Sequence, residues 1–312
     1  MIKAFITAFL ALGFLTSSGM ADYPKKDIEL IVPYGAGGGT DTAARLIQPH
    51  LEKILSTKLI ITNMPGAGGT VGASKFAQSK TDGYTLAFLP AGTAVYQPNL
   101  REVAYDNKSF APICMTINDP VGVSVGPDSS IKSLDQLITE AKNRTVLAGT
   151  AAPGSIPHVG SVLLNKGYGV NLKPVPLQNS AKISAAVLGG QVDMTADLVG
   201  NAVKFGLRPL AVLSDKRVET LPDVPTIDEL GGPSIRLSIW FALYAPAGTP
   251  QAIIDKLSAS CEKATSSSAY QDSVKKANRL PQFMNSEELG TFFQSEYKRT
   301  ADLFKEIGLG KK

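Results

Sequence analysis

Two glycine-rich segments are the parts of this sequence best suited to bind a ligand. Residues 32–41 read VPYGAGGGTD and residues 63–70 read NMPGAGGT, and each segment follows an apolar run and precedes a helix-like pattern. A strand that ends in glycines and starts a helix leaves backbone N–H groups bare beside the positive end of the helix dipole. Such a turn can hold a small anion. The two segments together predict a site for a negatively charged molecule.

Neither segment matches a nucleotide-binding motif. The dinucleotide fingerprint G-x-G-x-x-G needs a third glycine, but Thr40 and Val71 occupy that position, and the strand after the second segment lacks the ribose-binding acid. The Gly-Lys-Ser/Thr of a P-loop is missing as well. We therefore expect anion-binding loops without a nucleotide, and we expect no cofactor.

The sequence contains little that would support hydrolysis or metal binding. It has two histidines and neither an H-E-x-x-H nor a G-x-S-x-G motif. Ser155 and His158 could form a nucleophile–base pair, but such a pair needs an orienting carboxylate and an oxyanion site. In the other interpretation, Gly154 and Ser155 end a strand and open a helix, which gives a third turn rich in donors. No cluster of histidines, cysteines and acids predicts a metal site.

The first 21 residues have the pattern of a secretory signal. Lys3 supplies a positive charge, residues 4–15 are apolar, and small residues precede a cleavage site after about Ala21. The apolar stretch is too short for a stable membrane span, and no lipobox-like cysteine lies nearby. An uncleaved anchor is the alternative. We expect export to the periplasm and a mature protein that begins at Asp22.

The length of the chain favours two domains, and its charge gives no sign of a nucleic-acid partner. A chain of 312 residues exceeds the usual size of one core. The net charge of +4 comes from 31 basic and 27 acidic residues that form no basic cluster. Cys114 and Cys261 could be buried thiols or a disulfide, which an exported compartment permits. The sequence does not decide between these two states.

Short β-like runs alternate with helical periods, and this alternation predicts a parallel sheet. We expect an α/β fold with two lobes, each a mostly parallel sheet flanked by helices. The predicted lobes are residues 22–119 plus about 250–312, and residues 120–249, with hinge strands near 121–125 and 240–245. The predicted strands lie at residues 28–32, 59–61, 85–89, 121–125, 145–148, 173–177, 192–195, 210–213 and 240–244.

Two acidic residues each allow a functional and a structural interpretation. Asp41 either orients water or a ligand hydroxyl at the pocket mouth, or it stabilises the first helical turn through the helix dipole by about 0.3–1 kcal/mol. The second role is the more common one. Asp197, just past a strand end, either accepts a hydrogen bond from the ligand, bridges the lobes or is a solvated loop acid.

A characteristic set of short stretches runs along the chain, at residues 32–34, 37–38, 40–41, 63, 65–69, 82–86, 154–155, 158, 188–193, 221–226 and 245–250. With these stretches in this order and spacing, the chain resembles, over essentially its whole mature length, the periplasmic solute-binding proteins of tripartite tricarboxylate transporters, the Bug family. The resemblance implies a two-lobed type II periplasmic binding protein (a Venus flytrap) that is a monomer and not an enzyme. It implies that the protein gathers a small organic acid and delivers it to membrane permease subunits.

In this family, backbone amides of glycine-containing loops anchor a ligand carboxylate, often through bridging waters. The positions that the resemblance nominates here are Tyr34, Ala36, Gly37, Gly38, Gly92, Thr93, Ala94, Ser155, His158 and, at a family acidic position near the cleft, Asp197. Asp41 and Gly154 complete the predicted set of ligand-binding residues. A second-rank group either lines the pocket or only lets a helix and a strand pack closely, and it comprises Gly66, Ala67, Gly68 and Gly69.

The chain departs from the family pattern at three positions. Met64 stands where Arg is frequent, and Leu177 and Asn179 stand where Tyr and Gly are common. Leu177 lacks a phenol hydroxyl, which points to a less polar or aromatic acid. Di- and tricarboxylates, aromatic acids and amino acids all carry the anchoring group, so the ligand stays open. An exported Ser/His hydrolase and a ligand-sensing module for a membrane signalling protein are the alternative functions.

Overall fold

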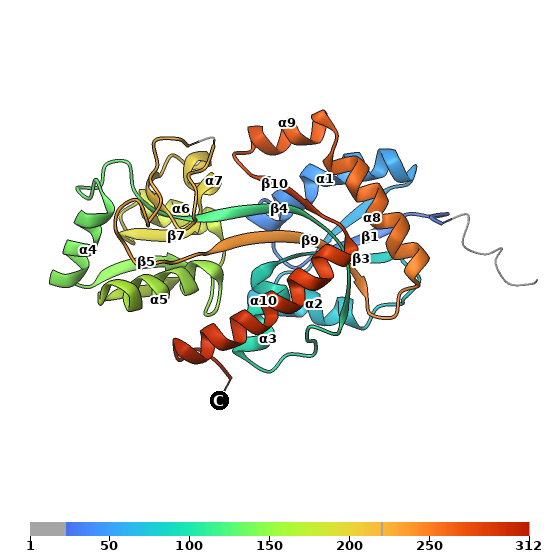
Figure 1. Cartoon of the computed structure of the whole chain (residues 1–312), viewed down its shortest axis with the longest axis horizontal. Helices are drawn as coiled ribbons and strands as arrows, with labels where there is room; N and C mark the ends of the chain where they lie inside the picture. Colours follow the sequence, from blue (N-terminus) through green and yellow to red (C-terminus); the bar gives the residue numbers. More distant parts are fainter. Residues whose placement is uncertain (1–22, 220, 312) are drawn as a thin grey trace, which may run out of the picture.

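The computed structural model describes residues 23–219 and 221–311 (Figure 1). The predicted signal peptide and its cleavage site lie outside these residues. The strands are β1 Ile28–Val32, β2 Leu59–Asn63, β3 Thr85–Pro90, β4 Phe110–Val125, β5 Val146–Thr150, β6 Leu172–Pro176, β7 Met194–Leu198, β8 Arg208–Val212, β9 Ser238–Pro246 and β10 Pro281–Met284. The helices are α1 Gly39–Leu55, α2 Thr70–Ala77, α3 Gln97–Leu100, α4 Leu134–Asn143, α5 Ile156–Tyr168, α6 Ser180–Leu188, α7 Val199–Lys204, α8 Gln251–Thr265, α9 Ser268–Lys276 and α10 Ser286–Glu306, with the short helical segments η1 Ala67–Gly69 and η2 Gly92–Tyr96.

The described strands form one continuous sheet in the order β2-β1-β3-β9-β4-β7-β5-β6, and β8 and β10 also pair with β4. The pairs β1–β2, β1–β3, β5–β6 and β5–β7 are parallel, as the strand–helix alternation predicts. β4 and β9 run antiparallel to their neighbours. The outer strands are therefore two parallel units, and two long antiparallel strands join them.

The two units lie at opposite ends of the molecule in Figure 1, and β4 and β9 run between them. We call lobe 1 the unit of β1–β3, β10, α1–α3 and α8–α10, and lobe 2 the unit of β5–β8 and α4–α7. The first part of β4 pairs with β9 and β10, and its last five residues pair with β7. The predicted hinge segments lie within β4 and β9, while the lobe boundaries and the hinge role stay predictions.

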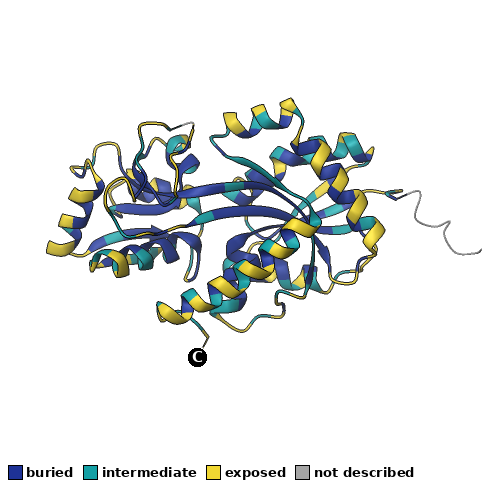
Figure 2. Cartoon of the chain, in the orientation of Figure 1, coloured by how far each residue is buried: buried dark blue, intermediate teal, exposed yellow. Residues whose placement is uncertain are grey.

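Burial follows the apolar pattern of the sequence. Strand β1 reads IELIV, and four of its five residues are buried. On α1 the buried apolar residues Ile47, Leu51 and Leu55 recur at helical spacing. Figure 2 shows the same arrangement, with dark blue strands between helices whose outer faces are yellow. The carboxyl ends of the parallel strands, where loops lead into helices, face the space between the lobes.

A disulfide joins Cys114 of β4 to Cys261 of α8, and it settles the alternative that the sequence left open. Both cysteines are fully buried. The bond therefore links the central strand to a helix that covers lobe 1. Over residues 23–219 and 221–311, no helix combines the length and the apolar character that a membrane span requires.

Candidate ligand-binding cleft

A cleft of about 630 Å³, measured up to its open mouth, lies between the lobes. Five of the predicted ligand-binding residues line it: Tyr34, Gly38, Gly92, Ser155 and Asp197. The other lining residues are Gly35, Gly39, Thr40, Pro90, Ala151, Ile156, Pro157, Gln178, Asn179, Ser180, Leu198, Ile239 and Phe241. The predicted residues that do not line it are Ala36, Gly37, Asp41, Thr93, Ala94, Gly154, His158 and the second-rank group Gly66, Ala67, Gly68 and Gly69.

The N-termini of three helices meet at this cleft. Gly39 and Thr40 start α1, Ile156 and Pro157 start α5, and Ser180 starts α6. Within the described part of the chain, no side chain caps α1 or α5. The first amides of a helix have no acceptor within the helix, so the first-turn N–H groups of α1 remain available to a ligand. Helices from both lobes therefore direct their positive dipole ends into one cavity.

Asp41 shapes the first glycine loop from outside the cleft. Its Oδ2 accepts hydrogen bonds from the Gly37 N–H and from Arg45 Nε, both at 2.9 Å, and its Oδ1 accepts one from Asn63 Nδ2 at 2.9 Å. Asn63 Nδ2 also donates to the Tyr34 carbonyl at 2.9 Å. The Gly37 amide is thus bonded within the protein. The structure favours a third role for Asp41: its carboxylate holds the glycine loop through hydrogen bonds, in addition to any effect on the helix dipole, and it does not line the cleft.

These contacts also set the charge of Asp41. Burial raises the pKa of its carboxyl, but hydrogen bonds from Arg45, Gly37 and Asn63 outweigh burial and hold the pKa below its usual value. Asp41 is therefore a carboxylate at neutral pH, and its charge keeps the loop that carries Gly38 in place.

The second glycine segment packs beneath the first and does not reach the cleft. The Tyr34 hydroxyl donates to the Gly68 carbonyl at 3.0 Å, and Thr93 Oγ1 lies 3.3 Å from the same carbonyl. At Gly69, which has φ +91°, an added Cβ would lie 2.3 Å from Thr93 Oγ1. Only glycine fits this close approach. Of the two interpretations of Gly66, Ala67, Gly68 and Gly69, the structure favours close packing.

Ser155 and His158 are bonded to their own turn and not to each other. Ser155 Oγ accepts a hydrogen bond from the Ala152 N–H at 3.3 Å, and His158 Nδ1 accepts one from the Gly154 N–H at 2.9 Å. Burial lowers the pKa of His158, so its ring is neutral. A neutral ring that accepts at Nδ1 carries its proton on Nε2 and has no second lone pair for a base. This geometry favours the interpretation of Ser155 as a helix-opening residue.

Asp197 is buried at the end of β7 and lines the cleft. Its Oδ1 accepts a hydrogen bond from the Leu198 N–H at 2.8 Å, and its Oδ2 has no partner among the described residues. Burial raises the pKa of this carboxyl against the opposing effects of Ser180, Leu198, Asn201 and Arg279. Because Asp197 is buried, it is not a solvated loop acid, which was one of the three interpretations of this residue from the sequence.

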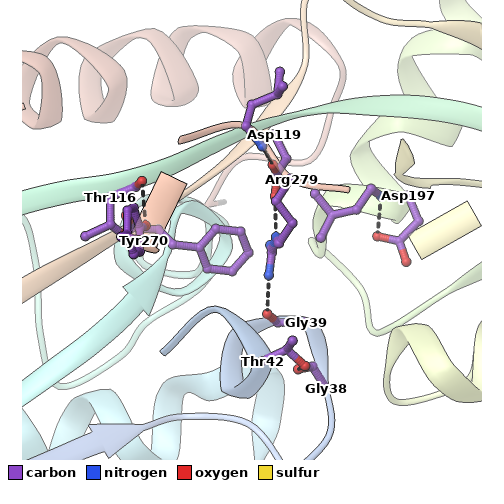
Figure 3. A network of polar contacts seen from close by, with 11 residues as sticks. Gly38, Gly39, Thr42, Thr116, Asp119, Asp197, Tyr270 and Arg279 are labelled. Atoms are coloured by element: carbon purple, nitrogen blue, oxygen red, sulfur yellow. Dashed lines mark hydrogen bonds and ion pairs between the residues drawn. The ribbon is translucent and has the colours of Figure 1, made fainter. Parts of the chain in front are cut away.

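A buried arginine holds the start of α1 against the central strand. Arg279 Nε donates to Asp119 Oδ2 at 2.7 Å, and Arg279 Nη1 donates to the Gly39 carbonyl at 2.8 Å. Figure 3 shows this side chain between Asp119 of β4 and the first turn of α1. The guanidinium also lies 4.5 Å from the centre of the Phe241 ring. The loop between α9 and β10 thus positions an edge of the cleft.

Several cleft residues were not among those predicted from the sequence. Pro90, Ile239 and Phe241 come from β3 and β9, and they give the cleft an apolar wall. Gln178 and Asn179 precede α6, where the Asn179 side chain caps the helix by accepting from the Lys182 N–H. An Asn before a helix is a readable cap signal. No such sequence signal marks the apolar wall, because an apolar strand residue that lines a cleft looks the same in the sequence as one that packs in the core.

Comparison with known proteins gives the same architecture. Residues 43–309 match the model of the tripartite tricarboxylate transporter family receptor. The structure of the periplasmic binding protein BugD has a TM-score of 0.85 and 29% identity, with 93% of this chain and 100% of that chain covered. The structure of R. palustris Rpa4515 with adipate has a TM-score of 0.88 and 29% identity, with 93% of this chain and 99% of that chain covered. The structure of MatC (Rpa3494) from Rhodopseudomonas palustris with bound malate has a TM-score of 0.81 and 29% identity, with 90% of this chain and 99% of that chain covered.

These likenesses confirm the predicted two-lobed periplasmic-binding-protein fold. The family match covers more than half of the chain and includes helices from both lobes. The chain therefore belongs to the tripartite tricarboxylate transporter receptor family, the family of the Bug and TctC solute-binding proteins.

Proposed function

We propose that this protein captures a small carboxylate-bearing metabolite between its lobes outside the cytoplasm and delivers it to a tripartite tricarboxylate-type permease. One observation carries the proposal: helix N-termini from both lobes converge on a single cleft. That geometry suits an anion. The neighbouring structures hold adipate and malate, which are both carboxylates, and they support the same ligand class.

The carboxylate is proposed to lie over the uncapped start of α1. The amides of Gly39 and Thr40 would donate to it from lobe 1, and the Ser155 hydroxyl from lobe 2. Pro90, Ile239 and Phe241 would contact the carbon skeleton. When the lobes close, water leaves the cleft, and each N–H···O⁻ hydrogen bond becomes stronger in the lower dielectric. The ligand favours the closed form to the extent that it contacts both lobes.

This proposal describes a receptor and not an enzyme. The Ser/His hydrolase is the weaker candidate, because His158 accepts a hydrogen bond at Nδ1 and Ser155 has no bond to it among the described residues. No feature of the described chain favours a sensing module over transport. Export with cleavage after about Ala21 belongs to the same proposal, and mass spectrometry of the mature protein would test it.

Two glycines at the cleft provide a direct test. Among the described residues, an added Cβ at Gly35 or Gly92 would meet no atom within 4 Å, so a side chain introduced there would start in open cleft space. A thermal-shift screen of carboxylic acids and their uncharged amides would first identify a ligand, since binding raises the melting temperature with affinity. Calorimetry with that acid should then show lost binding in Gly35→Val and Gly92→Val.

The matched control is Gly290→Val on α10, where an added Cβ also meets nothing within 4 Å but which lies outside the cleft. This control should bind the acid as the wild type does. If the amides bind as tightly as the acids, or if both cleft variants bind normally, the assignment of the ligand class or of the cleft is wrong.

A further inference from the structure

A second cavity, of about 790 Å³ up to its open mouth, lies between the lobes beside the cleft. Gly39 and Ser180 line both cavities. An added Cβ at Gly39 would lie 3.5 Å from Leu198 Cδ1 and 3.8 Å from Asn201 Nδ2, so the lobes touch where the two cavities meet. The polar side chains that line this second cavity are those of Thr42, Ser180, Asn201, Lys204, Lys276, Asn278 and Arg279.

The lining is cationic and includes no acidic residue. Lys204 ends α7 of lobe 2 and Lys276 ends α9 of lobe 1, and both are exposed. Within residues 23–219 and 221–311, neither lysine forms an ion pair, whereas Arg279 is paired with Asp119 at 2.7 Å. Two positive charges without a carboxylate partner among the described residues therefore lie on opposite lobes of one cavity, and Lys204 Nζ lies 5.3 Å from the centre of the Phe205 ring.

Two buried donors at this cavity also lack an acceptor. Arg279 is 5% exposed, and its Nη2 has no hydrogen-bond partner among the described residues. Asn201 Nδ2 likewise has no acceptor within hydrogen-bonding distance among the described residues, although its side chain lies close enough to Asp197 to lower the pKa of that carboxyl. Figure 3 shows how the other nitrogens of Arg279 are used, between Asp119 and the Gly39 carbonyl. A buried N–H group without an acceptor is costly, and an oxygen-rich ligand would remove that cost.

We propose that this second cavity binds an oxyanion group, a carboxylate or a phosphate, between the lobes. Like charges on opposite lobes oppose closure, and an anion held between them attracts both. Because the anion interacts more favourably with the closed form, its binding promotes closure and is coupled to cargo binding in the cleft. The anion is either a second acid group of the cargo or a free inorganic ion. Binding of a free ion does not depend on the proposed function, whereas binding of the second acid group rests on it.

The first test uses inorganic phosphate as the probe with the mature protein in a low-salt buffer, where charge effects are least screened. The variants are Lys204→Gln, Lys276→Gln and the pair. The matched control is Lys275→Gln, because Lys275 also lies in the last turn of α9 but does not line the cavity. We expect saturable phosphate binding in the wild type and the control, and roughly tenfold weaker binding in the double variant.

The second test separates the two sources of the anion by calorimetry with adipate and its half-amide, which keeps one carboxylate. If the cargo supplies the anion, the wild type prefers adipate, phosphate competes with it, and the double variant loses the preference. If a free ion binds, phosphate tightens the binding of both compounds in the wild type and not in the double variant.

The proposal is overturned if phosphate does not saturate the wild type, or if the double variant and Lys275→Gln respond alike in both tests. In that case, continued binding of carboxylates in the cleft would leave the proposed function standing. If no carboxylate binds to any variant or to the wild type while phosphate saturates the cavity, the proposed function fails and the anion site remains. Circular dichroism of each variant establishes that it is folded.

Discussion

Replacing Asp41 by alanine should destabilise the protein by much more than a helix-dipole effect. The variant loses hydrogen bonds from Gly37, Arg45 and Asn63. A hydrogen bond to a charged group contributes about 1.5–3 kcal/mol, but Arg45 is 49% exposed and its exposed ion pair contributes at most about 1 kcal/mol. With partial burial of the other two bonds, we expect a loss of about 2–4 kcal/mol in the free energy of unfolding.

The assay is urea unfolding at pH 7, together with calorimetry of the acid identified by screening. The control is Asp135→Ala, because Asp135 is an exposed acid in the first turn of α4. It should lose only the dipole interaction, about 0.3–1 kcal/mol, and no affinity. In Asp41→Ala the Gly37 amide is released and the start of α1 is no longer fixed, so affinity should fall roughly tenfold or more.

The pH dependence gives a second measurement of the same claim. Because hydrogen bonds hold the pKa of Asp41 below its unfolded value of about 3.9, its contribution is complete above that value. The contribution is lost as the pH falls through the folded pKa. The stability difference between wild type and Asp41→Ala should therefore shrink below about pH 4. If Asp41→Ala loses no more than Asp135→Ala at pH 7, the loop is not held by this carboxylate.

Three further outcomes are expected. Replacing Cys114 and Cys261 together by alanine should lower the free energy of unfolding by about 2–4 kcal/mol in denaturant titrations, and an unchanged midpoint would contradict a stabilising role. Residue 154 has φ +71°, and Gly154→Ala would place a methyl group 2.2 Å from Leu100 Cδ2, so the melting temperature of this variant should fall. Adding Leu100→Ala should restore part of the lost melting temperature. If it restores none, backbone strain at residue 154 is the only cause of the loss. Burial raises the pKa of Asp197, so the folded protein loses stability as the pH rises and this carboxyl must ionise. The melting temperature of Asp197→Asn should therefore exceed that of the wild type, by a margin that widens above about pH 4. A margin that stays constant with pH would contradict a raised pKa at Asp197.

Most of the fold is readable from the sequence because its signals are local. Apolar runs such as IELIV specify buried strands, and the strand–helix alternation specifies their parallel order. The short strand β10 was not predicted, since its four residues carry no clear β pattern and pair with β4 far away in the sequence. The disulfide was also undecidable, because a buried half of a disulfide and a buried thiol occupy the same kind of apolar helix face.

The cleft was predicted in outline and not in atomic detail. The glycine loops are visible in the sequence, and the ends of parallel strands must meet at one edge of a sheet. Whether an amide is free depends on tertiary contacts. Gly37 is engaged because Asp41 reaches it, and Gly68 is covered because Tyr34 and Thr93 reach it. Arg279 contacts Gly39 across 240 positions of the chain, a separation that no local pattern encodes.

The most direct measurement is a crystal structure of the protein with the acid that raises its melting temperature most. We expect one carboxylate of that acid between the lobes, with its oxygens accepting hydrogen bonds from the first-turn amides of α1 at Gly39 and Thr40 and from Ser155. A ligand that is bound through an uncharged group, or that lies away from the start of α1, would contradict this expectation.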